Sequence, residues 1–221
     1  MSIQNPRLLV LASGSATGGG SGFENMAYYF RSIRRTSRVE IAGVVSNHER
    51  GGVRQRADNL RIPFFHFRGP STAENYQRLV EDSRADFVAL SGWLKMVRGL
   101  DPKTTFNIHP GDTKKFGGKG FYGHHVHEAV LTAYRAGEIT HSAVTMHFAV
   151  DNEQYDTGPI FFQKEVDILH GDTSETLGNR VNQWEHYYQP RITELVVTGQ
   201  IYWDGENPES LHVPDNYTFL P

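Results

Sequence analysis

The chain has 221 residues, of which 38% are hydrophobic, so it can bury the core of one domain of ordinary size. Its 22 Lys and Arg residues are balanced by 25 Asp and Glu residues, which argues against nucleic acid or an anionic membrane as a partner. It contains no cysteine, which excludes disulfides, thiolate nucleophiles and zinc–sulfur sites. Any chemistry must come from His, Asn, carboxylates and the backbone.

The beginning of the chain does not resemble a targeting signal. The segment MSIQNPRLLVLASGS has one Arg and too short an apolar run for a signal peptide. No segment reaches the roughly 20 apolar residues that a membrane-spanning helix needs. We therefore expect a cytoplasmic protein without membrane contact.

Short apolar runs alternate with helical patterns in the first half of the chain, which is typical of βαβ units on a mostly parallel sheet. This pattern predicts a doubly wound, mostly parallel open α/β sheet. The expected strands are 7–13, 39–47, 62–67 and 86–93, and the expected helices between them are 23–35, 53–60 and 72–83.

The second half continues with an expected strand at 104–109, a helix near 124–137 and two strands near 142–150 and 159–168. A long helix should begin after Gly171 and run past Trp184, because Asp172 and Glu175 resemble a capping pair. From about residue 202 the tail loses periodicity. We expect one domain over residues 1–221.

A glycine-rich loop, SGSATGGGSGFENM, joins the first expected strand to the first helix. Free backbone N–H groups and the helix dipole attract phosphate at such a position. The loop matches neither the dinucleotide fingerprint nor the Walker pattern, so a merely flexible connection stays an equal alternative.

Asn107 and His109 stand two positions apart in FNIHP, so an extended chain would place both on one face of a strand. Pro110 ends that strand, and the segment GDTKKFGGKGFYG should form a mobile, glycine-rich flap beside it. The competing interpretation is a structural histidine.

Asp156 lies in the acidic loop HFAVDNEQYDTGP and could reach an imidazole on a neighbouring strand. Such a carboxylate would raise the pKa of His109 and make it a usable acid near neutral pH. Alternatively, Asp156 bonds only the backbone of its own turn.

Three further histidines, His124, His125 and His127, open an expected helix. They suggest a metal, but they lack the His-Glu-x-x-His arrangement, and we see no carboxylate at ligand spacing. We therefore expect no metal site. Glu185 and His186 on the last long helix would ordinarily form a solvated face.

Read in order, NIHP, GGKGFYG, HF followed by DTGP, and EHYYQP resemble the phosphoribosylglycinamide formyltransferase family over roughly residues 7–195. SGWLKMV is similar to the family's AGFMRIL segment. The resemblance implies a Rossmann-like formyltransferase fold and transfer of a formyl group from 10-formyltetrahydrofolate, as co-substrate, to the amine of glycinamide ribonucleotide in purine synthesis. It implies small-molecule partners, no metal and no nucleic acid, and it is compatible with a homodimer.

The resemblance also assigns roles to residues. It implies that Asn107, His109 and Asp156 are the catalytic trio, in which imidazolium and amide stabilise an oxyanion while the carboxylate keeps the imidazole protonated. The ribonucleotide would bind Gly20, Ser21, Gly22, Asn182 and Glu185. The folate would bind Leu94, Lys95, Met96, Val97, Asn107, Val150, Asp151 and Asp156.

The chain departs from the family pattern in its details. The phosphate loop carries several extra residues, and Gly22 replaces the usual Asn. HPGDTKKF stands where HPSLLP is common, and the segment from His147 to Asp156 is longer than in the bacterial form. Ala73 occupies the position of a folate-contacting Arg, so binding of the glutamate tail should differ.

Two related activities remain open, formyltetrahydrofolate hydrolase and sugar-amine N-formyltransferase, since both can share the trio. The glycine-rich loop and Glu185 favour the ribonucleotide. Methionyl-tRNA formylation is disfavoured because no second, basic domain is expected. A non-catalytic nucleotide-binding or folate-binding module is the alternative from another class.

Overall fold

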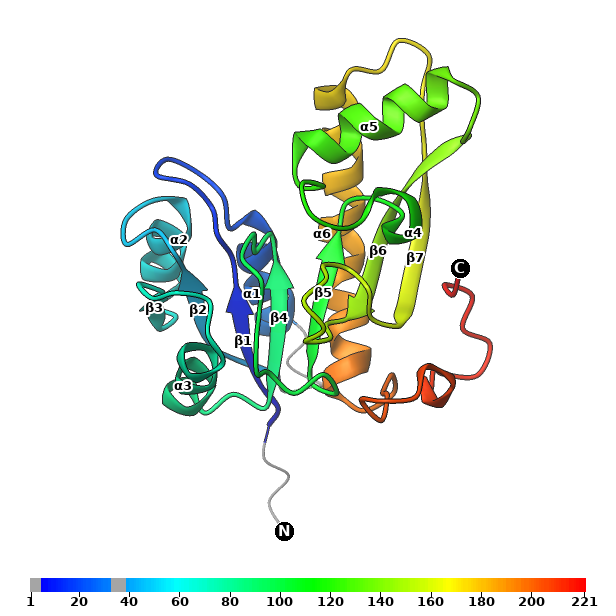
Figure 1. Ribbon diagram of the computed structural model, residues 1–221. Coiled ribbons are helices and arrows are strands. Elements are labelled where there is room, and N and C mark those ends of the chain that lie inside the picture. Colours follow the sequence, from blue (N-terminus) through cyan, green and yellow to red (C-terminus); the bar gives the residue numbers. More distant parts are fainter. Residues whose placement is uncertain (1–4, 33–38) are drawn as a thin grey trace.

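Seven strands form one sheet in the computed structural model, which describes residues 5–32 and 39–221 (Figure 1). Their order is β3-β2-β1-β4-β5-β6-β7. The pairings from β3 to β5 are parallel, whereas β6 pairs antiparallel with both β5 and β7. The predicted mostly parallel sheet is confirmed. The strands are β1 (Arg7–Leu11), β2 (Glu40–Ser46), β3 (Phe64–His66), β4 (Phe87–Ser91), β5 (Thr105–His109), β6 (His141–Phe148) and β7 (Ile160–Asp167).

The helices connect and cover these strands. Figure 1 shows the long α6 lying along β5, β6 and β7, with α5 crossing near its upper end. The first helix begins two residues earlier than predicted, and predicted residues 33–35 lie outside the described residues. The helices are α1 (Ser21–Ser32), α2 (Gly52–Leu60), α3 (Ala73–Ser83), α4 (Thr113–Phe116), α5 (His124–Arg135), α6 (Ser174–Val197) and the 3₁₀ turn η1 (Pro208–Ser210).

Strand β1 is buried on both faces, as a central parallel strand must be. Leu8 and Val10 join a large hydrophobic cluster with side chains of α1, α2, α5 and α6. Leu9 and Leu11 join a second cluster, which contains Tyr76 of α3. The period of two along the strand therefore sends alternate residues into the two layers that cover the sheet.

Two predicted local structures are wrong in detail. The segment after Pro110 contains the short helix α4, because Asp112 caps it through the Lys114 N–H and Phe116 is buried. The N-cap of α6 is Thr173, which forms a reciprocal capping box with Thr176. The predicted cap, Asp172, instead accepts hydrogen bonds from Arg180.

Asp172 anchors the start of α6 to the end of β7. Its carboxylate accepts hydrogen bonds from Arg180 at 2.7 and 2.9 Å, from the Leu169 N–H at 2.8 Å and from the Thr176 hydroxyl at 2.8 Å. The same Arg180 donates to the Asp167 carbonyl at 2.9 Å.

The predicted strands at 62–67 and 86–93 are shorter than expected, at Phe64–His66 and Phe87–Ser91.

Beyond α6 the described tail has little regular structure. It contains η1 and an isolated bridge between Tyr202 and His212, while Ile201 and Trp203 are buried in the large cluster. No helix within residues 5–32 and 39–221 is both long and apolar enough to cross a membrane.

Replacing Asp172 by Asn should destabilise the fold by about 1–3 kcal/mol at neutral pH, because charge-assisted bonds in a buried place are lost. The bond to Arg180 holds the pKa of Asp172 well below its ordinary value of 3.8. The stability that comes from a depressed pKa is fully present above the unfolded-state pKa and is lost as pH falls through the folded-state value. The difference in unfolding free energy between the variant and the parent chain should therefore be smaller at pH 3 than at pH 7. Urea denaturation at pH 7 and pH 3 measures it.

The matched control is Asp58→Asn, which breaks the exposed Arg54–Asp58 ion pair of α2. Exposed pairs contribute little, so this variant should stay within about 0.5 kcal/mol of the parent chain. Equal losses in the two variants would contradict a special role for Asp172.

Candidate active site

A cavity of about 590 Å³ lies at the carboxyl ends of β1, β4 and β5. That edge of an open α/β sheet is where ligands bind, and the volume suits small molecules. Its walls come from the glycine-rich loop, the segments after β4 and β5, the β6–β7 loop and α6. Of the residues that the sequence predicted, those lining it are Gly20, Ser21, Gly22, Leu94, Lys95, Met96, Val97, Asn107, His109, Val150, Asp156, Asn182 and Glu185.

Asn107 and His109 project from β5 on one face, as alternation predicts, while Phe106 and Ile108 enter the large hydrophobic cluster on the other. His147 was not among the site residues predicted from the sequence. In the antiparallel pairing of β5 with β6 it lies directly opposite Asn107, and its ring also lines the cavity. The HF dipeptide before the acidic loop was the only sequence signal for it.

Asp156 is the point where these side chains meet. Its Oδ1 accepts from Asn107 Nδ2 at 3.1 Å and lies 3.3 Å from His147 Nε2. Its Oδ2 accepts from the Gly118 N–H at 3.0 Å and lies 3.7 Å from His109 Nδ1. The predicted approach of Asp156 to His109 is therefore found, and the group also includes an amide, a second imidazole and the segment after α4.

The ring orientations of the two histidines follow from backbone acceptors. His109 Nε2 donates to the Phe116 carbonyl at 2.8 Å, which leaves Nδ1 facing Asp156. His147 Nδ1 donates to the Phe148 carbonyl at 2.8 Å, which leaves Nε2 facing Asn107 and Asp156. Each ring thus presents one fixed nitrogen to the carboxylate.

The electrostatics correct one expectation. Burial lowers the pKa of His109, and this effect exceeds the opposing influence of Asp156 and of the Phe116 carbonyl. The predicted rise in the His109 pKa is therefore wrong in sign, because its side chain is only 5% exposed. For Asp156, burial favours the neutral acid, but the His147 hydrogen bond, both imidazoles and the Gly118 N–H outweigh it and lower the pKa.

The loop that carries Asp156 has a demanding backbone. Asp156 has φ 58°, a left-handed conformation that Asp tolerates better than most residues. Two residues later, a Cβ at Gly158 would lie 1.8 Å from the Phe148 carbonyl oxygen, so only glycine fits. The Thr-Gly-Pro turn thus lets the loop return tightly to β6 and aim Asp156 inward.

The glycine-rich loop folds back before α1 begins. Ser15 N–H donates to the Gly18 carbonyl at 2.9 Å, and Gly18 N–H donates to Ser15 Oγ at 2.9 Å. The extra residues then pack against the start of α2, where a Cβ at Gly52 would lie 2.5 Å from Gly18 carbon. Arg56 of α2 donates to the Gly19 carbonyl at 3.1 Å and pairs with Glu24 of α1.

Ser21 and Gly22 form the first turn of α1, with Gly20 just before it. A Cβ at Gly22 would lie 2.4 Å from Ser91 Oγ and 2.9 Å from Gln189 Oε1, two side chains that are themselves 3.2 Å apart. The family's usual Asn does not fit here without displacing them. This pair explains the departure at Gly22, and Ser91 is itself a departure, since AGFMRIL has Ala there.

Helix α6 supplies the opposite wall. Asn182 Nδ2 donates to Glu185 Oε2 at 3.3 Å, and His186 Nε2 lies 3.1 Å from Ser21 Oγ. Glu185 is half-buried, and burial raises the pKa of its carboxyl to about 7, with the Asn182 bond opposing the rise. Glu185 and His186 do not form the solvated face that such a pair ordinarily would, because α6 turns both toward the cavity.

The residues predicted to bind folate line the cavity with one exception. Leu94 to Val97 and Val150 line the cavity, but Asp151 does not. Its carboxylate accepts from the Gly99 N–H at 2.7 Å and lies 3.9 Å from Arg98, which joins the β6–β7 loop to the segment after β4. Lys95 is a cation on this wall.

Comparison with known proteins identifies the family to which the chain belongs. The model described as formyl transferase matches residues 7–193. Chloroplastic phosphoribosylglycinamide formyltransferase of Vigna unguiculata is 33% identical over an alignment of 215 residues, which covers 92% of this chain and 64% of the relative. The Bacillus subtilis phosphoribosylglycinamide formyltransferase is 30% identical, over 82% of this chain and 92% of the relative.

Solved structures agree. Phosphoribosylglycinamide formyltransferase from Anaplasma phagocytophilum has a TM-score of 0.78 at 26% identity, covering 98% of this chain and 97% of that one. A formyltetrahydrofolate deformylase from Pseudomonas syringae pv. tomato has a TM-score of 0.74 at 22% identity over 97% of this chain and 67% of that one, which shows a shared fold alone.

The mostly parallel sheet, the glycine-rich loop after β1 and the Asn-x-His strand beside a buried carboxylate define the class, and the chain belongs to the formyl transferase family of enzymes. Within that family, the relatives named above are phosphoribosylglycinamide formyltransferases, so the resemblance in the sequence is confirmed. The chain spans slightly less than two thirds of the plant relative, at 64% of its length.

Gly22→Ala should destabilise the fold by about 1–3 kcal/mol, because the added methyl overpacks the space held by Ser91 and Gln189. Adding Ser91→Ala to this variant should recover part of the loss, since the nearest clashing atom is the Ser91 hydroxyl. Chemical denaturation of both single variants and the double variant gives the coupling free energy. Strictly additive losses would contradict the proposed contact.

Glu185→Gln should stabilise the fold as pH rises from about 4.5 to about 7. Because the folded-state pKa is raised, the folded chain holds a proton that the unfolded chain releases, and wild-type stability falls across that window. The variant lacks this fall, so its advantage should grow by at most about 3 kcal/mol. Urea midpoints across the pH range measure it, with exposed Glu175→Gln as the control. Parallel curves for Glu185→Gln and wild type would refute the assignment.

Proposed function

We propose that the chain transfers the formyl group of 10-formyltetrahydrofolate to the amine of glycinamide ribonucleotide. The observation that carries the proposal is the convergence of Asn107, His109 and Asp156 inside a cavity. The glycine-rich loop lines one part of that cavity, and the Leu94 to Val97 wall lines another. A phosphate-bearing amine and a flat formyl donor would meet at the trio between them.

In the reaction, the amine nitrogen attacks the formyl carbon and the carbonyl oxygen becomes an oxyanion. The bond from the formyl carbon to N10 of the folate then breaks, and the proton lost by the amine is matched by one gained at N10. The residues needed are donors that face the developing oxyanion. The candidate donors are Asn107 Nδ2 and His109 Nδ1, both next to Asp156, and His109 becomes a donor there once Nδ1 carries a proton.

The lowered pKa of His109 fits this role in a specific way. Burial keeps the imidazole largely neutral before the oxyanion exists. The proton released by the attacking amine would be held at His109 Nδ1 while the substrate oxygen is negative, and it would pass to N10 of the folate as the bond from the formyl carbon to N10 breaks. The added stabilisation therefore appears mainly in the transition state. Ionised Asp156 supports that charge and holds the Asn107 amide in place.

At the ribonucleotide end, the N–H groups at the start of α1 would hold the phosphate. Arg56 offsets the charge of Glu24, which would otherwise repel a dianion in the first turn of α1. Asn182 and Glu185 would contact the glycinamide part from α6. At the folate end, Lys95 is available for a carboxylate of the tail, whereas Ala73 offers no charge.

The rival activities differ in the acceptor. A hydrolase would use water in place of the amine, a sugar-amine formyltransferase would use another amine, and a binding module would not turn over. Glu185 and the phosphate loop on the acceptor side favour the ribonucleotide. Cytoplasmic location and a homodimer remain predictions of the sequence.

The deciding experiment follows absorbance of 10-formyl-5,8-dideazafolate with and without glycinamide ribonucleotide. Deformylation should require the ribonucleotide and should yield formylated product in equal amount. Deformylation without it would instead indicate a hydrolase. If the folate analogue binds but is not deformylated in either reaction, the result would indicate another amine acceptor or a binding role.

His109→Ala should lower kcat by about 10²–10³, the usual effect of removing one oxyanion donor. Binding of the ribonucleotide should change little, because the phosphate loop and α6 are untouched. Steady-state kinetics with circular dichroism as a folding check measures both effects. Near-normal turnover in a folded variant would refute the role of His109.

A further inference from the structure

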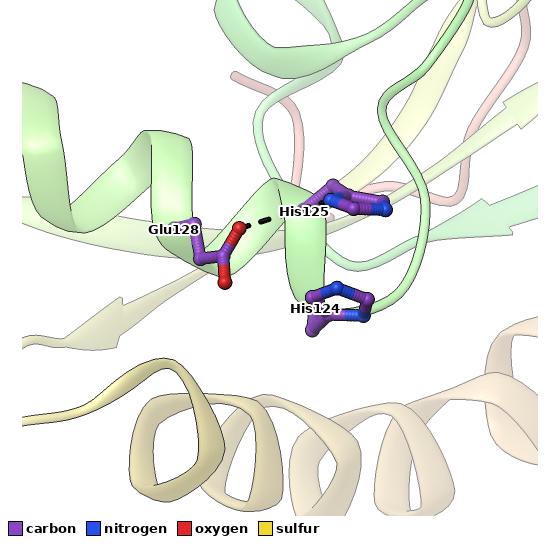
Figure 2. A group of neighbouring side chains, drawn as sticks. All are labelled: His124, His125 and Glu128. Atoms are coloured by element: carbon purple, nitrogen blue, oxygen red, sulfur yellow. Dashed lines mark ion pairs between the residues drawn. The ribbon is translucent and has the colours of Figure 1, made fainter.

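Two imidazoles and a carboxylate gather at the start of α5, outside the residues that line the cavity (Figure 2). They belong to His124, His125 and Glu128, and one ligand atom from each lies within 4.8 Å of the others. His125 Nδ1 and Glu128 Oε2 are 3.7 Å apart, and the two imidazole ring centroids are 3.9 Å apart. All three side chains are exposed, so an ion could reach them from solvent.

This cluster corrects the sequence analysis, which found no carboxylate at ligand spacing. Glu128 stands four positions after His124 and three after His125, so one helical turn brings it beside them. His127, the third histidine considered there, is separate: it is buried, and burial lowers its pKa to about 4. The three grouped residues are thus His124, His125 and Glu128.

We propose that these three side chains bind one divalent transition-metal ion of the zinc class. Imidazole nitrogens and a carboxylate oxygen are ligands that such ions accept, at about 2.0–2.2 Å from the metal. Two ligand atoms of one tetrahedral ion therefore lie about 3.3–3.6 Å apart, close to the 3.7 Å between His125 and Glu128. Small rotations of exposed side chains complete the set, and solvent supplies the remaining position.

The alternative is a simple surface ion pair between His125 and Glu128, which would bind nothing further. The chain offers a direct comparison. His141 and Glu165 form another such pair, at 3.2 Å, with side-chain exposures of 42% and 67% against 45% and 58% for His125 and Glu128. That pair does not belong to any group of three ligands within the described part of the chain. The second imidazole is what distinguishes the cluster.

The cluster lies at the N-terminal end of the α5 dipole and directly follows a segment that lines the cavity. The positive end of the α5 dipole opposes a cation, but by less than about a tenfold change in affinity at an exposed site. The cluster follows directly on Gly123, which ends the segment from Gly118 that lines the cavity. Tyr122 of that segment packs its ring edge against His125, with centroids 5.2 Å apart.

The test titrates the untagged, metal-free chain with Co²⁺, whose visible absorption reports nitrogen and oxygen ligation, and then displaces it with Zn²⁺. We expect one equivalent of Co²⁺ to bind. His125→Ala should weaken binding by about 100-fold or more, since loss of a ligand should exceed the 10–100-fold effect of losing an outer-shell partner. Glu128→Gln, which keeps the side-chain size, should weaken it in the same direction.

The control is His141→Ala, which removes the matched pair and should leave Co²⁺ affinity unchanged. Circular dichroism confirms that each variant is folded, as exposed substitutions should be. Absence of saturable binding to the parent chain overturns the proposal. Equal affinity in His125→Ala, or an equal loss in His141→Ala, overturns it as well, because the binding would then lie elsewhere.

Discussion

The Asp156 carboxylate is the interaction on which the site depends. It is 10% exposed, yet it is held ionised by contacts from four separate places: Asn107 on β5, His147 on β6, His109 at the end of β5 and the Gly118 N–H after α4. A buried charge with fewer partners would be costly, so these groups must assemble together. The same carboxylate therefore holds the Asn107 amide by a hydrogen bond and faces Nδ1 of His109, whose ring is oriented by the Phe116 carbonyl.

This arrangement balances burial against charge. The shielding that makes each electrostatic contact strong also lowers the pKa of His109 and opposes the imidazolium. Asp156 limits that penalty without removing it. A site in this condition responds strongly to new negative charge, which is the change that an acyl-type transfer produces. The strained φ of Asp156 and the obligatory Gly158 show that the backbone is adapted to hold the carboxylate there.

The sequence predicted features that arise from local periodicity. Alternation placed Asn107 and His109 on one face, and the run of apolar strands predicted the mostly parallel sheet. The motifs themselves predicted the family. The sequence could not predict the antiparallel register that sets His147 against Asn107, because this pairing depends on contacts between residues 40 positions apart. Nor could it give the sign of the His109 shift, which depends on how deeply the ring is buried, or the packing of Ser91 and Gln189 against Gly22.

The most direct measurement is an NMR titration of the His109 imidazole in the parent chain and in Asp156→Asn. The account predicts a pKa below the ordinary 6.5 in the parent chain, because burial prevails, and a still lower value in the variant, because the supporting charge is gone. A parent value above 6.5 would contradict the dominance of burial over the Asp156 charge, and no decrease in the folded variant would contradict the claim that an ionised Asp156 supports His109.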